Sequence, residues 1–84
     1  RVAIFLHQLA ERYKLLGRSD QRFMIPMSRE DIGSYLGLVI ETVSRTFSKM
    51  QEEGLITIHG REVQILKKEK LYSLAHESLP RKTA

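Results

Sequence analysis

Two short helical segments joined by a three-residue turn are the feature that most constrains how this chain can fold. The first segment is expected over residues 29–36, because Ser28 can cap it by accepting a backbone N–H and Gly37 breaks it. The second is expected over residues 40–53, before Gly54. Two short helices joined by a turn that contains glycine are typical of a helix-turn-helix.

The segment before this pair predicts one helix and one strand. Apolar residues recur at helical spacing over residues 2–16, and Gly17 is well suited to end that helix. A polar loop is expected over residues 18–22. Residues 23–27 are predicted to be a short extended piece, and Pro26 restricts it to the edge of a sheet because proline has no backbone donor.

The segment after the pair predicts a hairpin and a last helix. Two β-rich runs flank residues 59–61, so a hairpin, here called the wing, is expected over about residues 55–66. A weaker amphipathic pattern predicts a helix over residues 68–78, followed by a frayed tail. We therefore expect a mainly α fold with a small antiparallel β wing, a single winged helix-turn-helix domain over residues 1–84.

The apolar positions of the helices predict which faces pack in the core. These positions are Val2, Leu6, Leu9, Tyr13 and Leu16, then Ile32, Tyr35 and Leu36, then Val43, Phe47 and Met50. Gly33 lies inside a helix, which suggests that another backbone approaches it closely. Ile4 and Phe5 lie off the first stripe, so they either face a partner or belong to a helix that is buried on two sides.

The second helix of the pair carries a polar face suited to reading DNA bases. Glu41, Ser44, Arg45 and Ser48 follow the spacing of one helix face, in the first turns of the helix. Arginine can bind guanine with two hydrogen bonds, glutamate can accept from cytosine, and serine can serve either partner. Ile40 is expected at the edge of the core or against a thymine methyl group. The simpler interpretation is a solvated face with a Glu41–Arg45 ion pair.

Phosphate contacts are expected around this face. Arg29 begins the first helix of the pair, whose N-terminal N–H groups can hold a phosphate. The full set of expected phosphate contacts is Ser28, Arg29, Thr42, Ser48, Lys49, His59, Gly60 and Arg61, the last three at the tip of the wing. For single cations such as Arg29 and Lys49, an ordinary solvated surface position is the alternative.

Residue content excludes several other classes of protein. The chain has no cysteine, which excludes disulfides, a cysteine zinc site and a cysteine-held iron–sulfur cluster. Its three histidines, His7, His59 and His76, lack metal-binding spacing, and neither a glycine-rich phosphate loop nor a nucleophile beside a base is evident. We therefore expect no enzyme activity, no metal and no cofactor in this chain. The longest apolar run, residues 2–6, is too short for a membrane span.

The charge distribution gives only secondary support for nucleic-acid binding. The chain carries a formal net charge of +4, but residues 23–54 hold three basic and five acidic side chains. The prediction of DNA binding therefore depends on residue type and spacing. With few well-placed cations, we expect a shallow salt dependence, equivalent to about 2 to 4 phosphates.

Residues 28–61 resemble the DNA-binding domain of the CRP/FNR family of bacterial transcription regulators, and the likeness extends less specifically over residues 1–66. The motif that carries it is Asp31-Ile32-Gly33, Leu36-Gly37-Leu38 and Glu41-Thr42-Val43-Ser44-Arg45. The Glu-x-x-Ser-Arg pattern is most similar to the FNR and FixK branch. The resemblance implies a homodimer that reads a palindromic site in double-stranded DNA with TTGAT-like half-sites. Arg45 would read the guanine, Glu41 the cytosine opposite and Ser44 a neighbouring thymine.

The resemblance also implies partners and missing parts. The loop after the first helix can touch RNA polymerase in this family, and here it holds Arg18, Ser19, Asp20, Gln21 and Arg22. A solvated connection is the alternative for this loop. Family members carry a sensory domain and a dimerisation helix that these residues lack, so the chain, which begins with Arg, is expected to be a processed or excised piece of a cytoplasmic regulator.

One position departs from the family pattern. Val39 stands where members usually have threonine or serine, which caps the recognition helix and touches a phosphate. Valine cannot accept that hydrogen bond, and loss of a good cap typically costs about 1 kcal/mol. We expect weaker DNA binding or a helix start shifted by one residue.

Two function classes remain open beside an enzyme, which has little support. The first is sequence-specific binding of duplex DNA. The second is a winged-helix protein-interaction module in which residues 41–48 are merely solvated. Replacement of Arg45 by alanine discriminates between them, because it abolishes sequence preference only in the first case.

Overall fold

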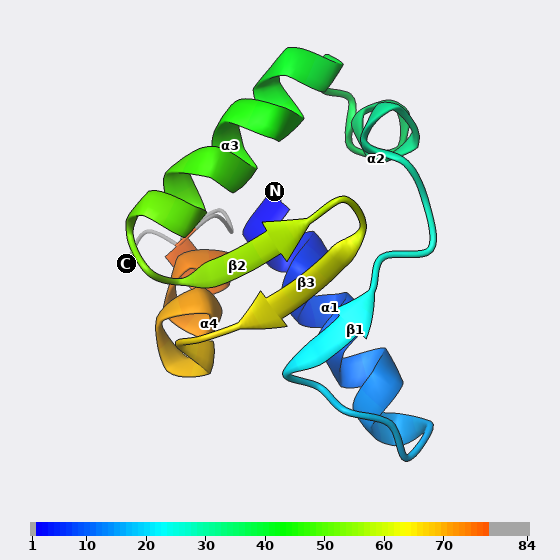
Figure 1. Cartoon of the computed structure of the whole chain (residues 1–84), viewed down its shortest axis with the longest axis vertical. Helices are drawn as coiled ribbons and strands as arrows, with labels where there is room; N and C mark the ends of the chain where they lie inside the picture. Colours follow the sequence, from blue (N-terminus) through cyan, green and yellow to red (C-terminus); the bar gives the residue numbers. More distant parts are fainter. Residues whose placement is uncertain (1, 78–84) are drawn as a thin grey trace, which may run out of the picture.

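Four helices and three short strands succeed one another in the computed structural model, which describes residues 2–77 (Figure 1). The elements are α1 (Val2–Leu15), β1 (Arg22–Met24), α2 (Arg29–Leu36), α3 (Ile40–Glu52), β2 (Ile56–His59), β3 (Glu62–Ile65) and α4 (Lys68–Glu77). This architecture is the expected winged helix-turn-helix: α2 and α3 are the helix pair, and β2 and β3 are the wing. The predicted frayed tail, residues 79–84, lies outside the described residues.

The three strands form one antiparallel sheet in the order β1-β3-β2. β1 is an edge strand, as Pro26 predicts. It is shorter than the predicted residues 23–27 and ends at Met24, although the N–H of Ile25 still donates to the carbonyl of Arg61 at 2.8 Å. Arg22, which was expected in the polar loop, pairs with Gln64 in the sheet instead.

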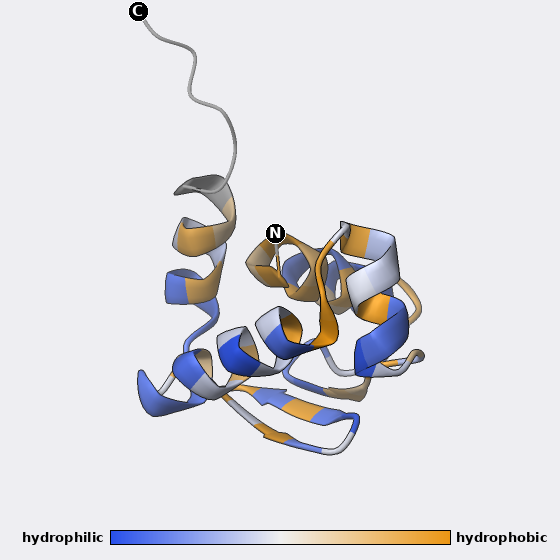
Figure 2. Ribbon diagram, turned by 90° about the horizontal axis from the view of Figure 1, so that it is seen from above, coloured by the Kyte–Doolittle hydropathy of each residue, from blue (hydrophilic) through white to orange (hydrophobic). Residues whose placement is uncertain are grey.

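The core lies between the sheet and the helices. α1 passes behind the sheet and lies beside α4 (Figure 1). The hairpin strands bury alternate residues, and Figure 2 shows the corresponding alternation of hydrophobic and hydrophilic positions along them. The largest fully buried side chains are Leu6, Ile32, Val43, Phe47, Ile56, Val63 and Leu71.

α1 is buried on two sides, which decides between the two interpretations of its off-stripe residues. Phe5 is buried and Ile4 packs against the core as a partly buried residue. The expectation that Leu16 extends the buried stripe is wrong, because Leu16 is 66% exposed. The helix ends at Leu15, and Gly17 with φ of 75° then turns the chain away from the core.

The close packing of α2 on the turn before α3 depends on Gly33. A Cβ placed on Gly33 would lie 2.5 Å from the carbonyl oxygen of Leu38, which confirms the predicted backbone approach. Val43, Phe47 and Met50 of α3 are buried as predicted.

Tyr35 does not join this core, so its predicted inward position is wrong. Tyr35 is 69% exposed, and its ring lies tilted against the ring of Phe5 with 6.1 Å between the ring centroids. On an eight-residue helix the side chain three positions after Ile32 lies at the border of the packed face, where the hydroxyl of tyrosine stays in water.

β2 and β3 lie within the predicted wing, residues 55–66, and α4 begins at Lys68, where the last helix was expected. Gly60, with φ of 62°, forms the tip of the wing. α4 buries Leu71 and Ala75, and residue 78, the predicted end, lies outside the described part. Among residues 2–77, the structure has no helix with the length and apolar character needed to cross a membrane.

Candidate nucleic-acid interface

The predicted base-reading residues lie together on the outer face of α3. Glu41, Arg45 and Ser48 are exposed, and Ser44 is half-buried. The opposite face of the helix is held by the buried Val43, Phe47 and Met50, so the polar face has a fixed orientation. The structure therefore presents the residues that spacing alone had placed on one side.

The Glu41–Arg45 ion pair, which belonged to the alternative interpretation of a solvated face, is not formed. Among the described side chains of residues 2–75, the ion pairs join other residues, and neither Glu41 nor Arg45 takes part in one. Both charged groups extend from the exposed face without a carboxylate or cation of the described chain as partner. Their hydrogen-bonding capacity is thus available to a ligand.

Ser44 is connected to α2 through Arg29. The Nη1 group of Arg29 donates to the Oγ atom of Ser44 at 3.2 Å. The guanidinium carbon of Arg29 also lies 5.3 Å from the centroid of the Phe47 ring, within the range of a cation–π contact. From the sequence, Arg29 was expected to contact a phosphate or to be an ordinary solvated residue, because nothing in a single sequence pairs two residues that are 15 positions apart.

The start of α3 is apolar and exposed. Val39 is the N-cap residue, with extended backbone angles (φ −79°, ψ 156°) and no side-chain cap hydrogen bond, as its sequence predicts. The helix begins at Ile40, so the start is not shifted. Val39 is 63% and Ile40 44% exposed, which places Ile40 outside the core and in reach of a ligand.

The residues expected to contact phosphates differ in their exposure and in their hydrogen bonds within the domain. Ser28 caps α2 by accepting from the N–H of Asp31 at 3.1 Å, which confirms the predicted cap and uses one lone pair of the hydroxyl. Lys49 is exposed, and Thr42 is half-buried with its carbonyl accepting from the Thr46 hydroxyl. His59, Gly60 and Arg61 are exposed at the tip of the wing.

The wing tip and the start of α3 lie toward the same end of the molecule. β2 runs back along α3 after the turn that follows the helix (Figure 1). The side-chain oxygen of Gln51 on α3 accepts from the N–H of Ile58 on β2 at 2.8 Å, which fastens the wing to the helix. Sequence reasoning missed Gln51, since a glutamine near a helix end gives no signal of such a partner.

The loop predicted to contact RNA polymerase lies away from the start of α3, at the far end of α1 (Figure 1). Arg18, Ser19, Gln21 and Arg22 are exposed, and the Ser19 hydroxyl accepts from the N–H groups of Gln21 and Arg22 at 3.2 Å each. Arg22 also forms an ion pair of 3.4 Å with Glu62.

Asp20 anchors this loop to the start of α4. Its carboxylate binds the ammonium group of Lys68, which also lies 3.5 Å from a carboxylate oxygen of Glu11. The hydrogen bond from Lys68 lowers the pKa of Asp20 below its ordinary value of 3.8, and the same bond raises the pKa of Lys68 above 10.5. The loop is therefore tied to α4 through this ion pair.

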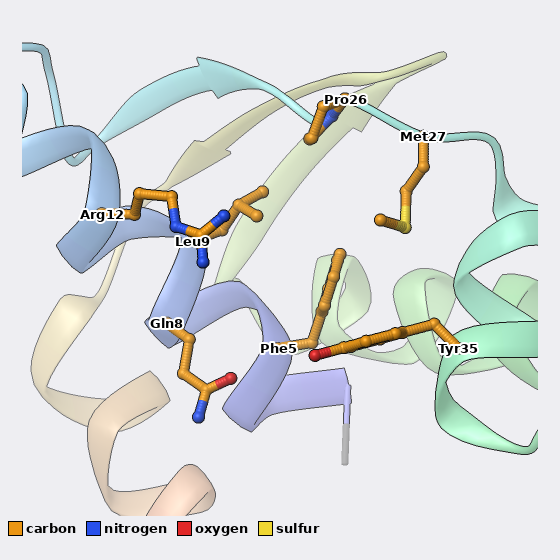
Figure 3. A pocket seen from close by; sticks show the side chains of 7 residues that line it. All are labelled: Phe5, Gln8, Leu9, Arg12, Pro26, Met27 and Tyr35. Atoms are coloured by element: carbon orange, nitrogen blue, oxygen red, sulfur yellow. The ribbon is translucent and has the colours of Figure 1, made fainter.

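A pocket of about 190 Å³ lies between α1, α2 and the segment that precedes α2 (Figure 3). Phe5, Leu9, Met27 and Tyr35 give it an apolar wall, with Gln8, Arg12 and Pro26 completing the lining. It contains none of the predicted base-reading residues. Among the side chains that the structure describes, those of residues 2–75, there is no group of three or more His, Asp or Glu that could hold a metal ion.

Comparison with known proteins agrees with this geometry. Residues 1–74 match the family model described as the Crp-like helix-turn-helix domain. The chain is 49% identical over 75 residues to the transcriptional activator protein anr of Pseudomonas aeruginosa, and 54% identical over 66 residues to the transcriptional regulatory protein btr of Bordetella pertussis. These alignments cover 89% and 79% of the chain but only 31% and 27% of the two relatives.

A solved structure shows the same fold. FixK2 from Bradyrhizobium japonicum superposes with a TM-score of 0.68 at 27% identity, over all of this chain and 40% of the FixK2 chain. The relatives are regulators and not enzymes, in keeping with the expectation from sequence. The chain therefore belongs to the CRP/FNR family of transcription regulators, as a Crp-like winged helix-turn-helix DNA-binding domain.

Proposed function

We propose that this domain binds double-stranded DNA at TTGAT-like half-sites, with α3 in the major groove. The observation that carries the proposal is the exposed face of α3, where Glu41, Ser44 and Arg45 lie together over a rigid buried face. Arg45 suits guanine because its guanidinium can make two hydrogen bonds to O6 and N7, and no carboxylate of the described residues competes for it.

The neighbouring side chains complete the proposed interface. Glu41 accepts from the cytosine amino group, Ser44 contacts a neighbouring thymine, and the exposed Ile40 lies against a thymine methyl group. Phosphates are contacted by Ser28, Arg29, Thr42, Ser48 and Lys49 from the helix pair and by His59, Gly60 and Arg61 from the wing. These backbone contacts fix the register of the protein on DNA, whereas the base contacts specify the sequence.

The partners of the whole regulator belong to the same proposal. The names of the relatives describe an activator and a regulatory protein, and the chain spans about a third of their length. We propose that the parent protein acts as a cytoplasmic homodimer on a palindromic promoter site, that residues 18–22 contact RNA polymerase, and that the domain itself needs no cofactor to bind DNA. Chelators should accordingly leave its DNA affinity unchanged.

A fluorescence-anisotropy titration at stated salt tests the DNA proposal. One duplex carries TTGAT and, about one helical turn away, its inverted repeat ATCAA, and a second carries a scrambled sequence. We expect tighter binding to the first duplex, and loss of this preference in Arg45→Ala. Arg12→Ala removes an exposed arginine of α1 and serves as the matched control. Equal affinity of the unmodified chain for both duplexes would favour the protein-interaction module instead.

A further inference from the structure

Arg29 contacts Ser44 on the polar face of α3, and a role in binding phosphate does not explain this contact. We propose that Arg29 is a positioning residue: it holds the Ser44 hydroxyl as a hydrogen-bond donor toward DNA and so decides which base edge Ser44 reads. This inference rests on the proposed DNA-binding function and assigns a specificity role to a residue of α2.

Two contacts fix the guanidinium of Arg29 on α3. It donates to the Oγ atom of Ser44 at 3.2 Å and lies 5.3 Å from the centroid of the Phe47 ring. Ser44 and Phe47 are three residues apart and therefore neighbours on the helix surface. Phe47 is almost completely buried, so its ring provides a rigid platform under the planar guanidinium. Arg29 is thus tied to α3 at two adjacent points.

The chemistry of the two groups fixes the direction of their hydrogen bond. A guanidinium has only donors, so the oxygen of Ser44 must accept and its hydrogen remains for another partner. Thr46, on the same helix, differs because its hydroxyl donates to the carbonyl of Thr42 at 2.8 Å. Among the residues whose side chains the structure describes, 2–75, no acceptor takes up the Ser44 hydrogen.

This arrangement selects among base edges. A free serine hydroxyl can donate or accept, but the Ser44 oxygen is already occupied by a charged donor. The remaining hydrogen suits thymine O4 or a purine N7, and it suits the amino groups of cytosine and adenine poorly because these donate. A charged donor on the oxygen also polarises the hydroxyl and strengthens the bond that its hydrogen makes.

A double-mutant cycle tests the proposal. Arg29→Ala, Ser44→Ala and the double variant are titrated with duplexes in which each base pair of the half-site is changed in turn. The position where Ser44→Ala relaxes discrimination identifies the base that Ser44 reads. We expect Arg29→Ala to relax discrimination at that position by about 3- to 10-fold, the worth of one net hydrogen bond. The double variant should lose no more than either single variant, because the two residues act as one unit.

Arg29→Lys separates positioning from a phosphate contact. Lysine keeps the positive charge but lacks the planar fork that bonds Ser44 and stacks on Phe47. Positioning therefore predicts that Arg29→Lys keeps the salt dependence of binding and still loses discrimination at the Ser44 position. If instead Arg29→Ala weakens all duplexes equally and lowers the salt slope by about one phosphate, with Arg29→Lys restoring both, the positioning role is wrong.

The outcomes also separate this inference from the proposed function. An unmodified chain that prefers the TTGAT duplex, together with additive effects of Arg29→Ala and Ser44→Ala, overturns the inference about Arg29 alone. An unmodified chain without sequence preference overturns both. Circular dichroism and thermal melting of each variant establish that changes in discrimination come from folded protein.

Discussion

The side-chain oxygen of Gln51 accepts a hydrogen bond of 2.8 Å from the backbone N–H of Ile58. Gln51 lies near the end of α3, and Ile58 lies in β2, which is an edge strand of the sheet. An edge strand directs one row of backbone groups away from its only neighbour, and Gln51 satisfies a partly buried member of that row. α3 and the wing are therefore joined by a specific bond as well as by apolar packing.

Replacement of Gln51 by leucine should loosen this connection. Leucine has a similar size but cannot accept, so the N–H of Ile58 loses its partner at a cost of about 0.5–1.5 kcal/mol in the free energy of unfolding. Urea denaturation measures the loss, and amide hydrogen exchange should show faster exchange at Ile58. Glu52→Leu changes the adjacent exposed residue and should do neither. Unchanged exchange at Ile58 in Gln51→Leu contradicts the assigned bond.

Gly33→Ala should destabilise the domain although alanine is the better helix former. The new Cβ would lie 2.5 Å from the carbonyl oxygen of Leu38, so the turn before α3 must move. We expect a loss of about 1–3 kcal/mol, the usual cost of overpacking. Ser34→Ala, at an exposed position of the same helix, is the matched control. A Gly33→Ala variant with an unchanged or higher melting temperature would show that the turn accommodates the methyl group.

Val39→Thr should stabilise the start of α3. The backbone of Val39 already has the extended angles of an N-cap residue, and only the side-chain acceptor is missing. A threonine hydroxyl could bond an N–H of the first turn and add about 0.5–1 kcal/mol to the free energy of unfolding. Tighter DNA binding should accompany the gain.

Val39→Ala is the control for that substitution, since it removes the exposed methyl groups without supplying a cap. Thermal melting and anisotropy are measured on both variants. If Val39→Thr leaves stability and DNA affinity unaltered, the missing cap has no consequence in this domain.

The Asp20–Lys68 ion pair should make stability depend on pH at both extremes. Since the pKa of Asp20 is lowered in the fold, its stabilising contribution is present above the ordinary value of 3.8 and is lost as the pH falls through the folded value. The raised pKa of Lys68 has the opposite sense: its contribution is present below 10.5 and is lost as the pH rises through the folded value.

Asp20→Asn tests the acid side of this dependence. The variant should have a lower urea midpoint than the unmodified chain at about pH 7, and the difference should shrink below pH 3.8 as the carboxyl group becomes protonated. Glu69→Gln, at an exposed position in the first turn of α4, is the control. A difference that stays constant into acid would mean that Asp20 stabilises the loop without its charge.

The spacing of apolar residues, together with the residues that cap or end helices, predicted the helices and the wing. Ser28 and Gly37 bound α2 as expected, because a serine cap and a left-handed glycine act within one or two residues of the backbone that they terminate. The buried face of α3 followed from its spacing for the same reason. The wrong predictions of burial fall near the ends of helices. Leu16 and Tyr35 have the spacing of buried residues, but they are exposed because no neighbouring element within residues 2–77 covers them.

The sequence by itself determined the helix pair, the wing and the polar residues on one face of α3, because these depend on local backbone geometry and side-chain period. Only the tertiary structure decided how that face is supported. Arg29 meets Ser44 across 15 positions, and Lys68 meets Asp20 across 48. Such pairs depend on how the elements pack against one another, and local propensities in the chain do not determine that geometry.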